Sequence, residues 1–437
     1  MSALLERYIS RLERNQPWRW SGRVLDLVGQ TIESSGPLAS VGECCEIQDQ
    51  FGHAHLAEVI GFRGSNVLSM PVESTEGIRY GNRVEALGVH PEIEVGPALM
   101  GRVLNALGAP IDEGRLPAVS TKLPLEGVSR SPMDRVPIRT PLGTGIRVLD
   151  ALLTVGRGQR VGIFGGSGVG KSTLIGIMTR NTEADVTVVG LVGERGREVG
   201  EFLEDSLGVA GRARSVVVVS TSDQSPLLRM RAALSATTIA EYFAAQGKNV
   251  LLVLDSLTRF AMAAREVGLA AGEPPTNKGY TPSVFSRLAR LVERAGQFRV
   301  GSITAFYTVL MEGDDQQDPI VDAVRSLLDG HVVLSRAMAA EGWYPPIELL
   351  DSISRLMPAV TQPAHREHSA LLRKMLAVYA RSEDLVRIGA YKPGSDPDLD
   401  RALRARGAMR TFMTQDSREQ VRFADCLKRL AQLAAEV

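Results

Sequence analysis

The sequence predicts an α/β fold: a parallel sheet covered by helices, with a small β-barrel before it and a helical domain after it. From about Gly145 to Arg336, apolar runs of strand length alternate with helical segments, which is typical of a parallel sheet. Upstream of this region, short β-rich pieces are separated by turn residues. Downstream of Pro363 the chain is rich in Leu, Ala, Arg and Lys and poor in β-branched residues, which favours helices.

These changes of pattern divide the chain into four segments. We expect an N-terminal amphipathic segment over 1–19, a β-barrel domain over 20–90, an α/β domain over 91–362 and a C-terminal helical domain over 363–437. More than one domain is expected on length alone, because 437 residues exceed what one ordinary hydrophobic core supports.

The first segment carries an apolar stripe at helical spacing, formed by Leu4, Leu5, Tyr8, Ile9 and Leu12. Such a helix packs on its own domain, or it serves as a docking segment for a partner helix or a membrane surface. The sequence favours neither interpretation.

The barrel is predicted from five short pieces that end in Gly, Asn or Asp turns: GRVLDLVG, CCEIQDQFG, LAEVIGF, NVLSMPV and NRVEALG. A stretch bearing Pro and Gly follows, from Pro110 to Pro141. We expect it to be an extended connector that lies over the next domain.

Apolar runs predict the strands of the α/β domain. They are expected at Arg160–Phe164, Val186–Val192, Ser215–Thr221, Asn249–Asp255, Val300–Val309 and His331–Ser335. The C-terminal domain should be helical with one break at the turn KPGSDPD.

The segment VGIFGGSGVGKSTLIGIM has the spacing of a Walker A loop: Gly165, four residues, then Gly170, Lys171 and Ser172. Glycines let the backbone curl around a phosphate with its N–H groups pointing inward, and the following helix adds its positive N-terminal dipole. Lys171 should reach the β- and γ-phosphates and the Ser172 hydroxyl should bind Mg²⁺. A purely structural Gly-rich turn is the alternative, but the order strand, loop, helix argues against it. The predicted nucleotide-binding residues of the loop are Gly165, Gly166, Ser167, Gly168, Val169, Gly170, Lys171, Ser172 and Thr173.

A second magnesium ligand is predicted at Asp255, where the run NVLLVLD ends. A carboxylate at the carboxyl end of a buried parallel strand faces the crevice in which ligands bind. Alone, such an Asp is more often a turn or a helix cap, but beside a Walker A loop the metal role is favoured.

Glu194 is the candidate for activating water, since it follows the apolar strand in VTVVGLVGERGREV. The charged cluster around it is equally consistent with a solvated run that caps a helix. Position alone leaves both interpretations open.

Composition excludes several classes of protein. The 50 basic and 50 acidic side chains give a formal net charge of zero, which argues against a protein held mainly by nucleic-acid phosphates. No apolar run approaches the length of a membrane span, and the first residues mix charges with apolar side chains unlike a signal peptide. We therefore expect a cytoplasmic location and no nucleic-acid partner.

Four longer motifs, GGSGVGKST, VGERGREV, LLVLDSLTRFAMAAREVGLAAGEPP and SITAFYTVLMEGDDQQDPI, resemble those of the flagellar type III export ATPases. That family is similar to the injectisome secretion ATPases and to the β subunit of rotary ATP synthases. The resemblance begins at about Gly22 and is weakest in the last seventy or so residues. It implies a RecA-like P-loop ATPase core with an N-terminal β-barrel and a C-terminal helical domain.

The resemblance also implies roles that spacing does not reveal. Glu194 matches the glutamate that activates water, and Arg195 and Arg259 match arginines around the phosphates. Tyr344 matches the aromatic that packs on adenine. Arg355 matches an arginine finger that enters the neighbouring subunit, although an arginine there would otherwise suggest an ordinary salt bridge.

The resemblance implies a homohexamer that hydrolyses MgATP for flagellar protein export. The implied partners are regulatory and stalk proteins, export chaperones and their cargo, with peripheral contact to an export gate at the inner face of the cytoplasmic membrane. An injectisome ATPase is the nearest alternative, followed by a rotary ATP synthase β-type subunit. A non-catalytic nucleotide-binding subunit is disfavoured by Glu194, and a ring-shaped RNA translocase by the zero net charge.

Overall fold

The computed structural model describes residues 19–114, 121–127, 131–311 and 318–437. These residues form two compact units. One comprises 19–92, Gln224–Leu228 and Ala263–Pro282; the other comprises Ile93–Asp223, Arg229–Met262 and Ser283–Val437. Apart from residue 19, the predicted amphipathic segment over 1–19 lies outside the described residues.

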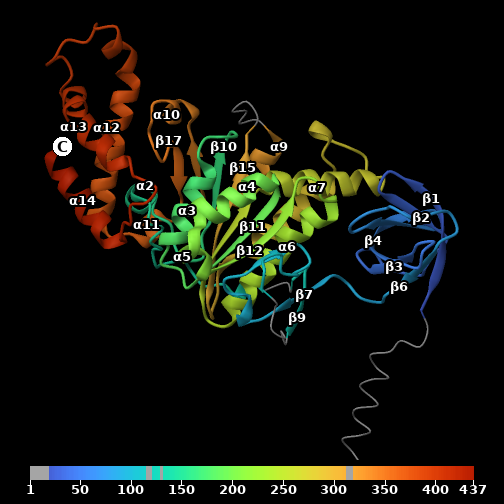
Figure 1. Ribbon diagram of the computed structural model, residues 1–437. Helices are drawn as coiled ribbons and strands as arrows, with labels where there is room; N and C mark the ends of the chain where they lie inside the picture. The colour runs from blue at the N-terminus through green and yellow to red at the C-terminus, as the bar shows by residue number, and fades with distance from the viewer. Residues whose placement is uncertain (1–18, 115–120, 128–130, 312–317) are drawn as a thin grey trace, which may run out of the picture. The chain divides into compact units, whose positions relative to one another are not determined.

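The first unit contains a closed antiparallel barrel, which confirms the predicted fold of this region (Figure 1). Within the described residues its strands, in barrel order, are β1 (Ser21–Val28), β2 (Thr31–Ser34), β5 (Asn66–Pro71), β4 (Ala54–Arg63), β3 (Cys44–Gln48) and β6 (Arg83–Ala86). Successive side chains of a strand point to opposite faces, so Val24 is buried in the barrel core while Leu25 is exposed. The sequence did not predict β2, which is four residues long.

The second unit is built on a mixed sheet whose main path is parallel except at the β17 edge. In the described chain its order is β17 (Ile347–Ser354), β16 (Gly330–Leu334), β10 (Arg160–Gly165), β15 (Ser302–Leu310), β13 (Asn249–Asp255), β11 (Val186–Glu194), β12 (Ser215–Thr221) and β8 (Val103–Asn105). A short strand, β14 (Gly296–Gln297), pairs with β15 off this path, and β7 (Glu92–Val95) pairs with β9 (Thr121–Pro124).

All six predicted strands of this sheet are confirmed, with small shifts at their ends. They are recognisable because a strand buried on both faces is a nearly continuous apolar run, and β11 is buried from Val186 to Gly193. The prediction that a strand begins at Val300 was wrong by two residues. Gly301 has a φ of +66°, outside the β region, so β15 begins at Ser302.

The predicted extended connector is only partly correct. It contains β8, which joins the edge of the main sheet by pairing with β12. The antiparallel edge strand β17 was not predicted either, although it lies directly before Arg355.

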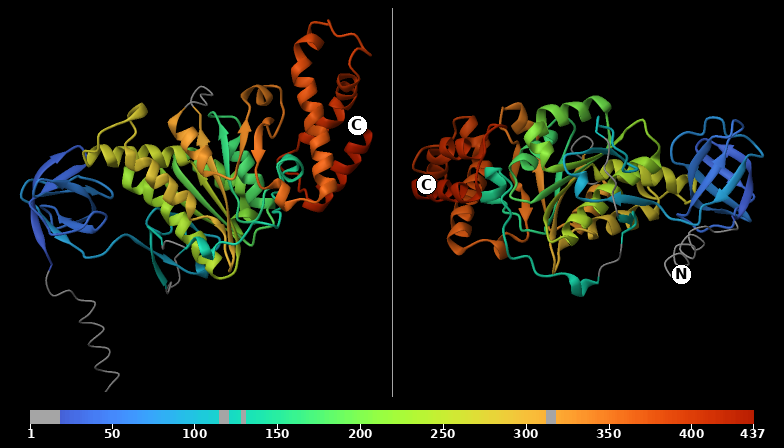
Figure 2. Two further views of the ribbon diagram at one scale, coloured as in Figure 1. Left: turned by 180° about the vertical axis from the view of Figure 1, so that it is seen from behind. Right: turned by 60° about the horizontal axis from the view of Figure 1, so that its bottom comes forward.

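Helices cover both faces of the sheet (Figures 1 and 2). The connections through α3 and α5 cross the sheet in one direction and those through α6 and α8 in the other, so the usual right-handed crossover places the two pairs on opposite faces. The helices of the described residues are α2 (Arg147–Leu152), α3 (Lys171–Asn181), α4 (Gly196–Glu201), α5 (Gly208–Ala213), α6 (Pro226–Ala245), α7 (Leu257–Ala270), α8 (Pro282–Glu293), α9 (Pro319–Leu327), α10 (Arg336–Ala340), α11 (Met357–Val360), α12 (Pro363–Arg387), α13 (Pro397–Met413) and α14 (Phe423–Glu436). A π-helical turn, Phe202–Leu207, joins α4 to α5, and short 3₁₀ turns occur at Pro97–Leu99, Pro132–Asp134 and Asn277–Gly279.

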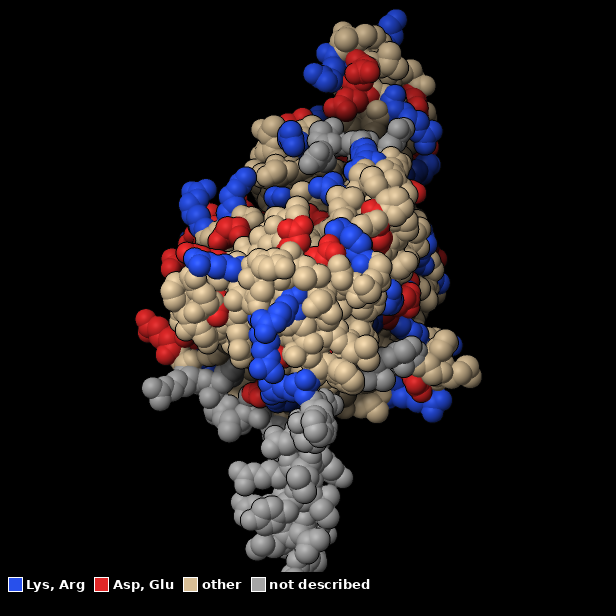
Figure 3. Space-filling view, turned by 90° about the vertical axis from the view of Figure 1, so that its right-hand side faces the viewer, with Lys and Arg blue, Asp and Glu red and all other residues tan. Residues whose placement is uncertain are grey.

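The surface carries both signs of charge. Figure 3 shows Lys and Arg side chains interspersed with Asp and Glu over the face that it presents. None of the helices in the described part of the chain has the length and apolar character needed to cross a membrane.

The C-terminal helices belong to the same compact unit as the main sheet. The break predicted at KPGSDPD is confirmed, since α12 ends at Arg387 and α13 begins at Pro397. Arg147 in α2 connects these helices to the sheet domain. Its Nε donates to the Phe412 carbonyl at 2.9 Å, and its remaining nitrogens bind the Thr414 carbonyl and the Glu419 carboxylate.

Arg147→Met should therefore destabilise the protein. Arg147 is 5% exposed, and its loss leaves the Phe412 and Thr414 carbonyls without this donor and removes the buried partner of Glu419, which costs about 3 kcal/mol. The free energy of unfolding in urea measures this. Arg429→Met is the matched control, because Arg429 pairs with the same Glu419 at 3.2 Å but its side chain is 55% exposed. Equal losses in the two variants would contradict the prediction.

Candidate active site

The site begins with the loop between β10 and α3. β10 ends at Gly165, and α3 starts at Lys171 as predicted. Gly168 and Gly170 have φ values of +78° and +91°, in the left-handed region that favours glycine. Ser167 and Gly168 are exposed, so the outer side of the loop is open to a ligand.

Lys171 is held close to this loop. Its Nζ donates to the Gly165 carbonyl at 3.0 Å and to the Gly166 carbonyl. The side chain is buried, and burial lowers the pKa of the ammonium while the nearby charges of Asp255 and Glu194 oppose that shift. Ser172 and Thr173, in the first turn of α3, are exposed.

Asp255 ends β13 at the same edge of the sheet. It is 6% exposed, and the Thr308 hydroxyl donates to its Oδ1 at 2.5 Å from the neighbouring strand β15. Burial raises the pKa of Asp255 above its ordinary value, while the Thr308 hydrogen bond and the Lys171 charge oppose the shift. The strand register therefore places this carboxylate beside the phosphate-binding loop.

Glu194 is aimed by an irregularity at the end of β11. The register between β11 and β12 shifts between Val192 and Glu194, so Gly193 is an extra residue in the strand. Gly193 has a φ of +70°, and a Cβ there would lie 3.1 Å from the Cβ of Arg259. Only glycine combines this backbone conformation with such a close approach.

Electrostatics couple Glu194 to its neighbours. Burial is the largest cause that raises the pKa of Glu194, to about 8; the Asp255 charge and a hydrogen bond with Glu198 add to it, and Arg259 opposes it. An added cation would relieve the repulsion between the Glu194 and Asp255 carboxylates.

The two arginines predicted around the phosphates lie differently. Arg259, in α7, is partly buried, with its charge near both Glu194 and Asp255. Its Nε is buried without a hydrogen-bond partner in the described structure. Arg195 directly precedes α4, as its N-cap residue; its side chain is 73% exposed and pairs with Glu198 at 2.7 Å.

Tyr344 lies beside the phosphate-binding loop, since a Cβ at Gly170 would be 3.8 Å from its ring. The ring is 48% exposed. It borders a cavity of about 270 Å³ lined by Gly170, Thr173, Leu174, Ile177, Tyr344, Pro345, Pro346, Gln415, Asp416 and Ser417. The Tyr344 carbonyl accepts a hydrogen bond from the Gln415 N–H at 2.7 Å, which ties this wall to the C-terminal helices.

Arg355 lies at the amino ends of the parallel strands, whereas the loop and Asp255 lie at their carboxyl ends. β17 runs antiparallel to β16, with Ile347 opposite Leu334 and Ser354 opposite Gly330. Since β16 is parallel to β10, Arg355 is level with Asp329 and Arg160, about five residues, or roughly 16 Å, down the strands from the loop of its own chain. Its side chain is exposed.

Sequence reasoning missed three residues of the site. Thr308 fixes Asp255, and Glu198 lies close enough to Glu194 to raise the pKa of that carboxyl. Arg336, the first residue of α10, is close enough to Lys171 for its charge to lower the pKa of the ammonium. Their position along the strands could have indicated two of them: Thr308 and Arg336 lie near the carboxyl ends of parallel strands, as Asp255 does.

The donors fit a hard divalent cation. Asp255 provides a buried carboxylate and Ser172 an exposed hydroxyl, and oxygen donors are those that Mg²⁺ prefers. The repulsion between Asp255 and Glu194 also favours an added positive charge.

Three family descriptions match the chain in sequence. The ATP synthase alpha/beta family, beta-barrel domain, matches residues 24–88, and the nucleotide-binding domain of the same family matches 145–354. The T3SS EscN ATPase C-terminal domain matches 361–432. Fold and site together define a P-loop ATPase with the nucleotide-binding domain of the ATP synthase α/β family.

Relatives match over nearly the full length. The chain is 52% identical to a flagellum-specific ATP synthase of Treponema pallidum, covering 98% of this chain and 96% of that protein. It is 46% identical to a type 3 secretion system ATPase of Xanthomonas euvesicatoria, over 98% and 97% of the two chains. The structure of the assembled ATPase EscN from the enteropathogenic E. coli type III secretion system has a TM-score of 0.90 at 43% identity, covering 94% of this chain and all of that one.

The chain therefore belongs to the family of flagellum-specific ATP synthases and type 3 secretion system ATPases. This confirms the resemblance stated from the motifs, the predicted fold class and the predicted ATP hydrolase activity.

Proposed function

We propose that this chain hydrolyses MgATP within a ring of identical copies and thereby energises the export of flagellar proteins. The observation that supports it most is the division of catalytic groups between the two edges of one sheet. Lys171, Asp255 and Glu194 gather at the carboxyl edge, whereas Arg355 lies at the amino edge.

ATP occupies the carboxyl edge in this proposal. The backbone N–H groups from Gly165 to Thr173 surround the phosphates at the positive end of α3. The Lys171 ammonium neutralises the β- and γ-phosphates. The adenine base packs on Tyr344, in the cavity beside Gly170.

Asp255 and Ser172 would hold Mg²⁺. When bound, the ion stabilises the negative charge that develops on the transferred phosphoryl group. Thr308 keeps the Asp255 carboxylate in place through its hydrogen bond.

Glu194 orients the attacking water and takes its proton. For this role the carboxylate must be ionised, and the positive charges of Arg259 and of bound Mg²⁺ would oppose the burial that raises its pKa. Arg259, whose charge lies near Glu194 and Asp255, stabilises charge on the phosphates, and exposed Arg195 does so from the start of α4.

Arg355 acts in the neighbouring copy. Its distance from its own loop, together with its exposure, suits a residue that is donated across an interface. When every copy carries both a loop and a finger, a head-to-tail contact that closes gives a ring with equivalent sites. A ring is also supported by the similarity to the assembled EscN.

Mixing two inactive variants tests the shared site. The Lys171→Ala variant has a defective phosphate-binding loop and an intact Arg355. The Arg355→Ala variant has an intact loop and no finger. If rings form at random from equal amounts, roughly a quarter of the interfaces join an intact loop to an intact finger. We expect phosphate release to recover to about that fraction of the wild-type rate.

Each variant alone should form rings and remain nearly inactive. Wild-type turnover per subunit should also rise with protein concentration as rings assemble. A finger that acts within its own chain would give no recovery on mixing, so no recovery together with concentration-independent wild-type turnover would contradict the proposal.

The choice of flagellar export over an injectisome rests on the motifs and on flagellum-specific relatives that reach 52% identity, compared with 48% for a type 3 secretion relative; the ranges, 45–52% and 46–48%, overlap. The partners proposed are a central stalk, as in the structure of EscN with its stalk EscO, together with regulatory proteins, export chaperones and cargo. The proposed location is the cytoplasm, at the inner face of the membrane beside an export gate. Deleting the gene should abolish flagellin export, and restoration by Lys171→Ala would contradict a role for hydrolysis.

Tyr344→Ala should weaken ATP binding without slowing the chemical step. Stacking of a base on an aromatic ring contributes about 1–3 kcal/mol, so we expect the KM for ATP to rise by about tenfold or more. Because adenine is remote from the reacting phosphate, kcat should change little. Tyr344→Phe, which keeps the ring, is the control. Steady-state kinetics measure both constants, and a fall in kcat alone would contradict the role.

A further inference from the structure

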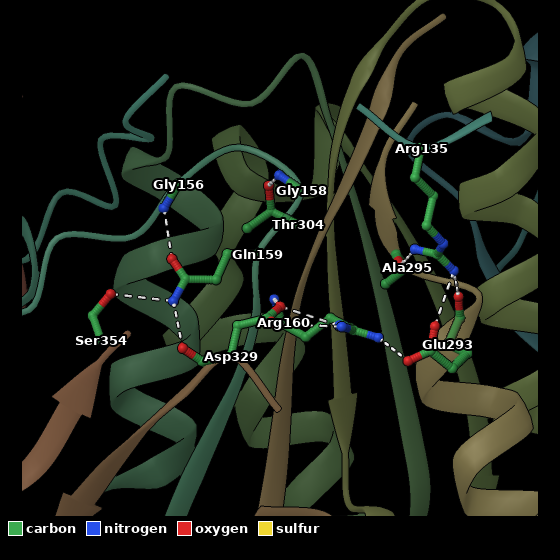
Figure 4. A network of polar contacts seen from close by, with 10 residues as sticks. All are labelled: Arg135, Gly156, Gly158, Gln159, Arg160, Glu293, Ala295, Thr304, Asp329 and Ser354. Carbon is green, nitrogen blue, oxygen red and sulfur yellow. Dashed lines mark hydrogen bonds and ion pairs between the residues drawn. The ribbon is translucent and has the colours of Figure 1, made fainter. Parts of the chain in front are cut away.

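A polar network lies at the amino edge of the main sheet, around Gln159 (Figure 4). Gln159 directly precedes β10, so the strand that ends in the phosphate-binding loop begins in this network. The side chain is completely buried, at 0% exposure. A buried amide must satisfy its donors and acceptor within the protein.

The Gln159 amide joins three segments. Its Oε1 accepts from the Gly156 N–H at 2.8 Å. Its Nε2 donates to the Asp329 carbonyl at 3.2 Å and to the Ser354 hydroxyl at 3.1 Å. Both acceptors lie on the NH₂ side and the one donor lies on the oxygen side, so the orientation of the amide is defined by its partners.

Two of these partners determine the position of Arg355. The Arg355 N–H donates to the same Asp329 carbonyl, at 3.0 Å. The preceding residue, Ser354, donates its hydroxyl to the Thr154 carbonyl at 2.7 Å while accepting from Gln159. The backbone at 354–355 is therefore held from both sides by groups that Gln159 bonds.

The surroundings leave the amide little freedom. A Cβ at Gly330 would lie 2.6 Å from the Ile353 carbonyl oxygen and 3.3 Å from the Gln159 Nε2, so only glycine allows β16 and β17 to approach this closely. Asp329 is fixed as well, since its Oδ2 accepts from the Arg160 N–H and Nε, each at 3.1 Å.

We infer that Gln159 is a positioning residue for Arg355, which aims the finger at the active site of the neighbouring copy. The inference rests on the proposed donation of Arg355 across an interface. Gln159 would act without contacting nucleotide, and it lies at the far end of β10 from its own phosphate-binding loop. β10 then has Gln159, which positions the finger for the neighbouring copy, at its start, and the phosphate-binding loop of its own copy at its end.

The first test uses Gln159→Met and Ser354→Ala. Both remove the hydrogen bond between Gln159 and Ser354, and the serine variant does so with a smaller change in volume. A displaced finger should lower kcat by about ten- to a hundredfold, with the KM and Kd for ATP near wild type.

Thr304→Val is the matched control. Thr304 is 2% exposed, and its hydroxyl accepts from the Gly158 N–H at 2.8 Å in the same turn, without contacting Asp329 or Ser354 (Figure 4). This variant should keep a near wild-type kcat. Should Gln159→Met fail to fold, Ser354→Ala alone decides. A wild-type kcat in the folded variants would overturn the inference.

Mixing then distinguishes a misplaced finger from general damage. Each variant is mixed with Lys171→Ala, which has an intact finger, and separately with Arg355→Ala, which has an intact loop. If the finger is misplaced, Lys171→Ala restores activity to the level of the Arg355→Ala and Lys171→Ala control mixture, and Arg355→Ala restores none.

Recovery with Arg355→Ala would mean that the loop is damaged and the finger is intact, which overturns the inference. Recovery with neither partner would mean general structural damage and also overturns it. If the control mixture itself does not recover, the donation of Arg355 across the interface fails, and that result is separate from the behaviour of Gln159.

Discussion

Glu194→Gln should abolish nearly all turnover while ATP still binds. Glutamine has the shape of glutamate but cannot accept the proton of the attacking water, so we expect kcat to fall by about a hundredfold or more. The substitution also removes a negative charge near Asp255, so the Kd for MgATP should stay close to wild type or improve. Phosphate release and the binding of a fluorescent ATP analogue measure the two effects separately.

Glu201→Gln is the matched control for this substitution. Glu201 lies in the adjacent helix α4 and pairs with Arg197 at 3.3 Å, with its side chain 52% exposed. Its loss should leave kcat unchanged, because an exposed ion pair of this kind contributes little. Hydrolysis by Glu194→Gln at the wild-type rate would show that another group activates water.

Lys171→Ala should impair both binding and chemistry. The Gly165 and Gly166 carbonyls hold the ammonium beside the loop, and in the proposed site it would contact the phosphates before and during transfer. Removing a charged donor from the transition state costs about 10²–10³ in rate, and weaker ground-state binding adds to the loss. We expect kcat/KM to fall at least about a thousandfold, with a higher Kd for ATP.

Lys248→Ala provides the comparison for the lysine. Lys248 is exposed and directly precedes β13, at the edge of the sheet opposite the loop. The loss of one positive charge there should not affect binding. A Lys171→Ala protein that binds ATP tightly and hydrolyses it normally would overturn the assignment of the whole site.

The sequence predicted the interior of the sheet better than its edges. Central strands such as Asn249–Asp255 are buried on both faces, so they read as continuous apolar runs that end at a polar residue. The edge strand Ile347–Ser354 mixes buried and exposed positions without strict alternation, because its register with β16 shifts between His331 and Val333. β8 has three residues inside a Pro- and Gly-bearing stretch, and tertiary pairing rather than local propensity makes it a strand.

Some residues of the candidate site could be predicted from local sequence patterns, and others could not. Lys171 and Asp255 follow from spacing and from strand ends, because those signals are local. Thr308 contacts Asp255 across two neighbouring strands, so no local pattern reveals it. The proposed roles of Tyr344 and Arg355 came from family resemblance. The geometry adds that one lies beside the loop and the other far from it.

The loop between α13 and α14 forms part of the cavity beside Tyr344, through Gln415, Asp416 and Ser417. The C-terminal helices therefore share a wall with the cavity in which we propose that adenine binds. If a shift of these helices changes the affinity of the pocket for a ligand, then that ligand changes the energy of the shift by the same amount. If ATP binds in this cavity as proposed, a protein that binds α13 or α14 in only one arrangement would change the affinity for the nucleotide, and the nucleotide would change the affinity for that protein by the same factor.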